Sequence, residues 1–224
     1  MKNKIMNKIF GTKNLVFCIV IVISSFSLFI LNAHATGYYY KGTGSLTSTS
    51  SWGTNTNGSG TQPSNFTNSY QVFNIRNISS VTLDANWTVS GISSKVVLGD
   101  GTGACTFIIP ASFKLTGSID VSANGYLNIA NASIPDLGTI NTSSTIEYSS
   151  ASAQTIDGTV NYGNLIISSS GTATTGEAFN VYGNLTIKSN GILNATSAIT
   201  TTAGKTFTIE NGGRYIHNNE VSVK

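Results

Sequence analysis

The sequence writes one twelve-residue phrase twice, at residues 117–128 and 183–194, and this repetition limits what the chain can fold into. In both copies apolar residues alternate with polar ones, an Asn-Gly pair follows, and an apolar Leu stands two positions after the Gly. The alternation predicts short strands, and Asn-Gly predicts a tight turn because both residues tolerate positive φ. Recurring strand–turn units indicate a solenoid, in which each coil buries its apolar face against the next coil.

The second half of the chain allows the period to be measured. Tyr-Gly-Asn-Leu at 162–165 returns 20 residues later at 182–185, and Leu-Thr-Ile at 185–187 is followed 22 residues later by Phe-Thr-Ile at 207–209. Coils of 20–22 residues are typical of a parallel β-helix, and the leucine-rich-repeat pattern of similar length is missing. We therefore predict an all-β, right-handed parallel β-helix over residues 72–224. An antiparallel β-sandwich is the alternative, because regularly spaced short strands also indicate that fold.

Residues 36–71 differ in composition from the repeats. Turn-forming residues are dense there, and Trp52, Phe66 and Tyr70 are spaced among them. The end coil of a solenoid exposes its interior unless another segment covers it. We predict that residues 36–71 form a loop-rich cap whose aromatic side chains cover the first coil.

The first 35 residues have the pattern of a secretory signal peptide. Four lysines precede a nearly uncharged apolar run at 15–31, and Ala33-His34-Ala35 provides a small-x-small cleavage pattern. We predict cleavage after Ala35. A single membrane anchor is the alternative, because the run could just cross a bilayer. The expected location is extracellular or on the cell surface, or in the periplasm if an outer-membrane export signal is missing.

Charge and cysteine content narrow the partners. Cleavage would leave eight Lys/Arg against nine Asp/Glu, and charged residues make up only 9% of the whole chain, well below the usual quarter. Such a chain has no basic face for phosphates, so we expect no nucleic-acid partner. Cys105 would be the one remaining cysteine, which excludes an internal disulfide and indicates a buried, inert thiol.

Candidate catalytic and metal-binding residues are weak. Asp136 and Asp157, 21 residues apart, come closest to a carboxylate pair one coil apart, but Asp157 precedes a glycine and indicates a turn. The loop at residues 99–103 lacks the lysine of a P-loop and the repetition of a calcium β-roll. We therefore predict no catalytic residue, no cofactor and no metal ligand.

One pair of aromatic residues could contact glycans. Tyr162 and Tyr182 stand one coil apart, and exposed rings stack on sugar faces. The alternative is that both rings pack as corner residues between coils.

Several motifs together resemble a known class of proteins. The segments at residues 52–66, 73–77, 85–89 and 95–101, with the two Tyr-Gly-Asn-Leu phrases, resemble the amino-terminal part of large secreted β-helical, adhesin-like surface proteins of Bacteroidetes-type bacteria. Those proteins usually end in a sorting domain for type IX secretion. The present sequence departs from them in having no such domain before Lys224, which suggests an amino-terminal fragment of a longer protein.

The resemblance and the composition together predict a secreted, non-enzymatic structural or adhesin-like protein. A carbohydrate-binding or polysaccharide-degrading β-helix is the alternative. The expected partners are glycans or other surface proteins, with no stable membrane span after cleavage. The short polar segment after residue 217 is too small to cover an apolar coil, so we also expect self-association through an open carboxyl-terminal coil.

Overall fold

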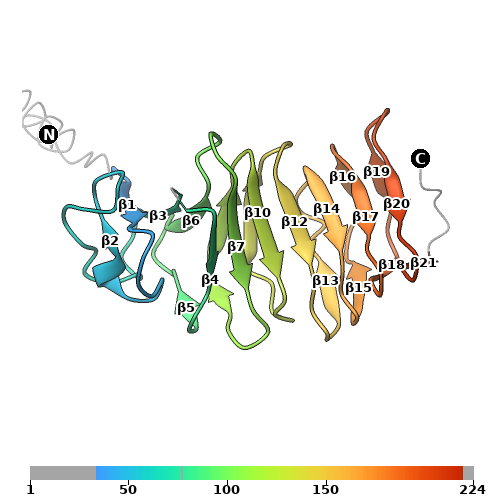
Figure 1. Cartoon of the computed structure of the whole chain (residues 1–224), viewed down its shortest axis with the longest axis horizontal. Coiled ribbons are helices and arrows are strands. Elements are labelled where there is room, and N and C mark those ends of the chain that lie inside the picture. Colours follow the sequence, from blue (N-terminus) through green and yellow to red (C-terminus); the bar gives the residue numbers. More distant parts are fainter. Residues whose placement is uncertain (1–33, 77, 219–224) are drawn as a thin grey trace, which may run out of the picture. The chain divides into compact units, whose positions relative to one another are not determined.

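A computed structural model describes residues 34–76 and 78–218. The chain divides into two units, and the unit from Ala35 onward consists of short strands with one 3-10 turn, η2 (Thr49–Ser51). Its strands pair in parallel with strands of neighbouring coils, except for the antiparallel pair β1–β2 (Figure 1). The predicted parallel β-helix is confirmed, and the antiparallel sandwich is wrong. The predicted signal peptide at 1–35 lies almost wholly outside the described residues.

Two large sheets and three smaller ones form the faces of the coils. The six-stranded sheet has the order β11 (Asp136–Ile140), β9 (Ser118–Val121), β6 (Lys95–Leu98), β3 (Gln71–Ile75), β1 (Thr36–Tyr40), β2 (Trp52–Gly53). The seven-stranded sheet has the order β20 (Phe207–Ile209), β17 (Leu185–Ile187), β14 (Asn164–Ile167), β12 (Thr145–Tyr148), β10 (Gly125–Ile129), β7 (Cys105–Ile109), β4 (Ser80–Thr82).

The smaller sheets complete the coils. The four-stranded sheet has the order β13 (Gln154–Ile156), β15 (Thr172–Thr175), β18 (Ile192–Ala195), β21 (Arg214–His217). Two strand pairs remain: β16 (Phe179–Val181) with β19 (Ile199–Thr201), and β5 (Trp87–Thr88) with β8 (Leu115–Thr116).

Apolar side chains stack in register inside the seven-stranded sheet. Leu165 pairs with Leu185 and Leu185 with Phe207, while the neighbouring column joins Ile167 to Ile187 and then to Ile209. The residues of β14 and β17 in these columns are at most 1% exposed. The predicted columns are therefore confirmed, but in β20 Ile209 is 47% exposed and Phe207 is half-buried. No described strand pairs with the far edge of β20.

Coil length is regular only in the second half. Pairing of Leu165 with Leu185 and of Leu185 with Phe207 gives coils of 20 and 22 residues, as predicted. Elsewhere the offset between paired residues ranges from 18, for Ile119 and Leu137, to 28, for Trp87 and Leu115. The strands keep their register while the loops between them change length.

The two copies of the repeated phrase occupy different faces. Residues 117–128 run from β9 in the six-stranded sheet to β10 in the seven-stranded sheet, whereas residues 183–194 run from β17 to β18 in the four-stranded sheet. In both copies the Asn takes the left-handed conformation, with φ of 61° at Asn124 and 66° at Asn190. The phrase therefore encodes a corner between two strands, and the fold uses it at two different corners.

The glycine of each corner has a separate function. Gly125 and Gly191 do not have positive φ. A Cβ on Gly125 would lie 2.8 Å from Cγ1 of Val121, and one on Gly191 would overlap the carbonyl oxygen of Ile167 in the preceding coil. Glycine is required here because the backbones of two coils approach closely.

Aromatic side chains close the amino-terminal coil. Trp52 is fully buried, and its ring centroid lies 5.3 Å from that of Phe73 and 5.4 Å from that of Trp87. Phe66 packs edge-on against Trp87 at 5.5 Å. The aromatic cap is confirmed for these residues, but Tyr70, with φ of 60°, is 38% exposed and does not join them.

The cap does not end where the repeats begin. Residues 36–71 include β1, which already pairs in parallel register with β3. The stack of strands therefore begins at Thr36, and the loop between β1 and β3 carries Trp52 and Phe66 over its end.

Candidate functional site

The two tyrosines expected to contact glycans have different environments. Tyr162 is fully buried, whereas Tyr182 is 42% exposed. The hydroxyl group of Tyr162 donates to the carbonyl oxygen of Asp157 at 2.6 Å and lies 2.9 Å from the hydroxyl of Tyr148. Tyr162 is therefore an internal corner residue, and the two rings do not form an exposed pair. Glycan contact by Tyr182 stays a prediction.

Side-chain amides connect consecutive coils at the corner after residue 162. The Oδ1 atom of Asn164 accepts the backbone N–H of Asn184 at 3.0 Å, and that of Asn184 accepts the N–H of Thr206 at 3.1 Å. The Nδ2 group of Asn164 donates back to the carbonyl of Ser144 at 3.2 Å. The Asn of the Tyr-Gly-Asn-Leu repeat thus continues the inter-coil bonding just before each strand begins.

A buried carboxylate lies on the outer side of the seven-stranded sheet. Glu147 projects outward from β12, yet it is only 6% exposed. Tyr126 and Asn128 of β10 donate to its Oε2, the latter at 2.9 Å. On the other side, Ser168 donates to Oε1 at 2.6 Å, and the ammonium group of Lys188 lies 3.3 Å from the same atom.

The charge state of Glu147 follows from these contacts. Burial alone would raise the pKa of the carboxyl group, but the hydrogen bonds from Ser168 and Tyr126 and the charge of Lys188 outweigh it and lower the pKa. Burial and the neighbouring carboxylate raise the pKa of Tyr126. The group is a closed network across four coils, because both carboxylate oxygens are occupied.

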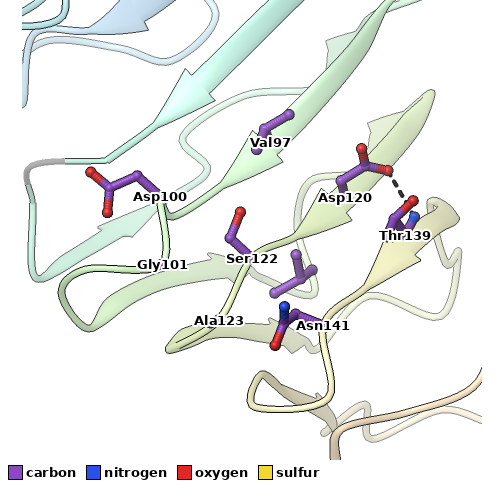
Figure 2. A pocket seen from close by; sticks show the side chains of 9 residues that line it. Val97, Asp100, Gly101, Asp120, Ser122, Ala123, Thr139 and Asn141 are labelled. Atoms are coloured by element: carbon purple, nitrogen blue, oxygen red, sulfur yellow. Dashed lines mark hydrogen bonds between the residues drawn. The ribbon is translucent and has the colours of Figure 1, made fainter.

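A hollow of about 390 Å³ lies where three strands of the six-stranded sheet end (Figure 2). Strands β6, β9 and β11 belong to successive coils, so the hollow crosses three coils. Its lining residues are Val97, Asp100, Gly101, Asp120, Val121, Ser122, Ala123, Thr139 and Asn141. In the view of Figure 2, Asp100 lies on one side of Ser122, and Asp120 and Thr139 lie on the other.

Both carboxylates of this hollow are held in place by neighbouring groups. Asp120 accepts the ammonium group of Lys95 at 2.5 Å and the N–H of Thr139 at 2.8 Å. Asp100 accepts the N–H and hydroxyl of Thr102, at 3.0 and 2.6 Å, and lies 3.7 Å from Arg76. The hydrogen bonds from Thr102 lower the pKa of Asp100. The carboxylates therefore present fixed acceptors.

Other sequence candidates have structural roles. The side chain of Asp157 accepts the N–H of Thr159 at 2.8 Å, so it stabilises its own turn, as predicted. Asp100 does the same in the loop at residues 99–103, which is also a turn. Burial raises the pKa of the Cys105 thiol to about 11, in agreement with an inert thiol. Within residues 34–76 and 78–218, no three acidic, His or Cys side chains gather in a way that could hold a metal ion.

Comparisons of the chain with protein-family models, curated proteins and solved structures found no match. No helix in the described part of the chain is long and apolar enough to cross a membrane. Any functional argument therefore depends on the residues and the fold themselves.

Sequence reasoning missed both the Glu147 network and the hollow. Glu147 receives its partners from positions 19, 21 and 41 residues away, which come together only after the coils stack. The regular alternation of apolar and polar residues would place Glu147 on the solvent side. A possible signal was that one carboxylate falls, at one-coil offsets, between Asn128 and Ser168.

Proposed function

We propose that the chain is a secreted, non-enzymatic structural module of the cell surface or extracellular space, with an adhesin-like role. The observation that carries the proposal is the in-register stacking of parallel strands from β1 to β21. Such a stack maintains a fixed spacing between the groups on its outer faces, as a spacer or a binding platform requires.

The character of the outer faces supports the same role. Carboxylates and amides such as Asp120, Glu147 and Asn164 are turned towards neighbouring coils, where they stabilise the stack. The chain uses few charges, and neutral hydroxyl and amide groups cover much of its surface. A surface of this kind stays hydrated by hydrogen bonding.

The amino-terminal pattern supports export. The first described strand begins at Thr36, directly after the expected cleavage site, and the N–H of Thr36 donates to the carbonyl of Tyr70 at 2.8 Å. Removal of residues 1–35 would leave the first strand intact.

Fractionation of a Gram-negative host that expresses the full chain tests the proposal. We expect a product outside the cytoplasm that begins at Thr36, and Ala35→Arg should block its processing because a large charged residue does not fit the cleavage position. Ala123→Arg, a similar change far from the leader, is the control. A wild-type product that retains Met1 in the cytoplasm would contradict the export part of the proposal.

A display experiment tests the adhesin-like part. The chain is fused to an established surface carrier, and cell attachment to immobilised matrix and glycan coatings is compared with that of cells displaying the carrier alone. We expect increased attachment without release of reducing sugar ends. Attachment equal to the carrier, or release of sugar ends, would favour the alternative of a polysaccharide-degrading β-helix.

Self-association through the last coil stays a prediction. It is supported by the exposed Ile209 and the half-buried Phe207 of β20. Static light scattering over a wide concentration range measures it: a rising mass is expected, and a constant monomer mass would refute it.

A further inference from the structure

We propose that the hollow at the ends of β6, β9 and β11 binds a neutral saccharide. This goes beyond the structural role, because a spacer needs no ligand. The hollow has about 390 Å³, which lies within the range of small-molecule sites. Because it crosses three coils, an extended oligosaccharide can lie along the stack.

Two polar groups in the hollow have no partner within the protein. The hydroxyl of Ser122 and the Nδ2 group of Asn141 make no hydrogen bond with other described residues, while Oδ1 of Asn141 accepts the N–H of Ser143 at 2.9 Å. The carboxamide is therefore oriented by its oxygen, and its nitrogen remains a donor for a ligand.

The carboxylates supply the complementary acceptors. Each carboxylate has about four acceptor positions, and Asp120 uses one for Lys95 and one for Thr139. Asp100 likewise accepts two hydrogen bonds, both from Thr102. A sugar hydroxyl both donates and accepts, so neighbouring hydroxyls can donate to a carboxylate and accept from Asn141.

The remaining lining selects a neutral ring. Val97 and Ala123 provide apolar surface against which the C–H face of a sugar can pack. Lys95 and Arg76, which pair with the two carboxylates, do not line the hollow. The hollow therefore has negative charge and disfavours uronates and sulfated sugars.

Titration calorimetry of the purified chain tests this inference. The probes are cellotetraose, mannotetraose, xylotetraose and maltotetraose, with tetragalacturonate as the acidic comparison. We expect at least one neutral tetrasaccharide to bind with a Kd below about 10 mM. Ser122→Ala removes a hydroxyl without an internal partner and should weaken that binding about tenfold.

A second variant blocks the space itself. Ala123→Trp should fill the hollow and abolish binding, whereas Ala151→Trp, at an exposed alanine outside the hollow, should bind as wild type. Circular dichroism checks that both variants are folded, and Ser122→Ala decides the matter if Ala123→Trp is not.

Three results would overturn the inference. These are no binding of any neutral probe at about 10 mM, tighter binding of tetragalacturonate than of every neutral probe, or unchanged binding in both folded hollow variants. None of them bears on the structural proposal, which the fractionation and display experiments test separately.

Discussion

The corner residues of this fold meet two different requirements at adjacent positions. Asn124 and Asn190 have positive φ, while the glycines that follow them allow two coils to approach closely. The sequence predicted an Asn-Gly corner correctly. It did not predict that the Asn carries the left-handed conformation, because either residue can adopt it.

Gly191→Ala tests this division of function. Its Cβ would overlap the carbonyl oxygen of Ile167, which is backbone and cannot rotate away. We expect a loss of about 2 kcal/mol or more in the free energy of unfolding, measured in urea. Gly103→Ala is the matched control, because a Cβ there meets nothing within 4 Å, and it should change stability by less than about 0.5 kcal/mol. Equal effects of the two changes would contradict the close approach.

Glu147 gives the protein a defined response to acid. Its pKa is lowered in the folded state, so its contribution to stability is full above the unfolded value of about 4.3 and disappears as pH falls through the folded value. Glu147→Gln should therefore cost about 1–3 kcal/mol at pH 7 and much less near pH 3.

Unfolding in urea at both pH values measures this effect. Glu177→Gln, at an exposed carboxylate, serves as the control and should have little effect at either pH. If Glu147→Gln were equally destabilising at pH 7 and pH 3, the network would owe its stability to packing alone.

At the scale of strands, stability is concentrated where coils have neighbours on both sides. Leu185 of β17 lies between Leu165 of β14 and Phe207 of β20 and is 1% exposed. Ile209 of β20 has a described partner on one side only, Ile187, and is 47% exposed. The same type of side chain should therefore have unequal weight in the two coils.

Truncation of these side chains measures the difference. Leu185→Ala should cost about 2–5 kcal/mol, because it removes buried contacts and leaves a cavity. Ile209→Ala should cost less than about 1 kcal/mol. Thermal or urea unfolding compares the two, and a similar loss in both would mean that Ile209 is buried in solution.

The sequence predicted the strands better than it predicted their assignment to faces. The Tyr-Gly-Asn-Leu repeat disclosed the second-half period because Asn164 and Asn184 make the same inter-coil bond in successive coils. In the first half, the offsets of 18 to 28 residues hide the period, because strand pairing tolerates loops of any length between columns. The burial of Tyr162 was unpredictable for a related reason, since its partners Tyr148 and Asp157 lie in a variable corner.

At the scale of the whole stack, the claim on which everything else depends is that the coils are in parallel register. Ile108, Asn128, Glu147, Ile166, Thr186 and Thr208 form one outward column, in which each residue pairs with the next. Adjacent strands lie about 4.8 Å apart, so Ile108 and Thr208 should be separated by five steps, or about 24 Å. Ile108 and Thr186 should be separated by about 19 Å. The hollow and the Glu147 network both exist only if this register holds.

Distances between spin labels test this register most directly. Cysteines are introduced at Ile108 with Thr208, and at Ile108 with Thr186, in a Cys105→Ala background, and pulsed electron resonance measures each separation. We expect two narrow distributions whose centres differ by about 5 Å, one inter-strand step, with the Thr208 pair longer. Broad distributions, or a Thr186 pair as long as the Thr208 pair, would contradict the parallel stack and with it the sites described on its faces.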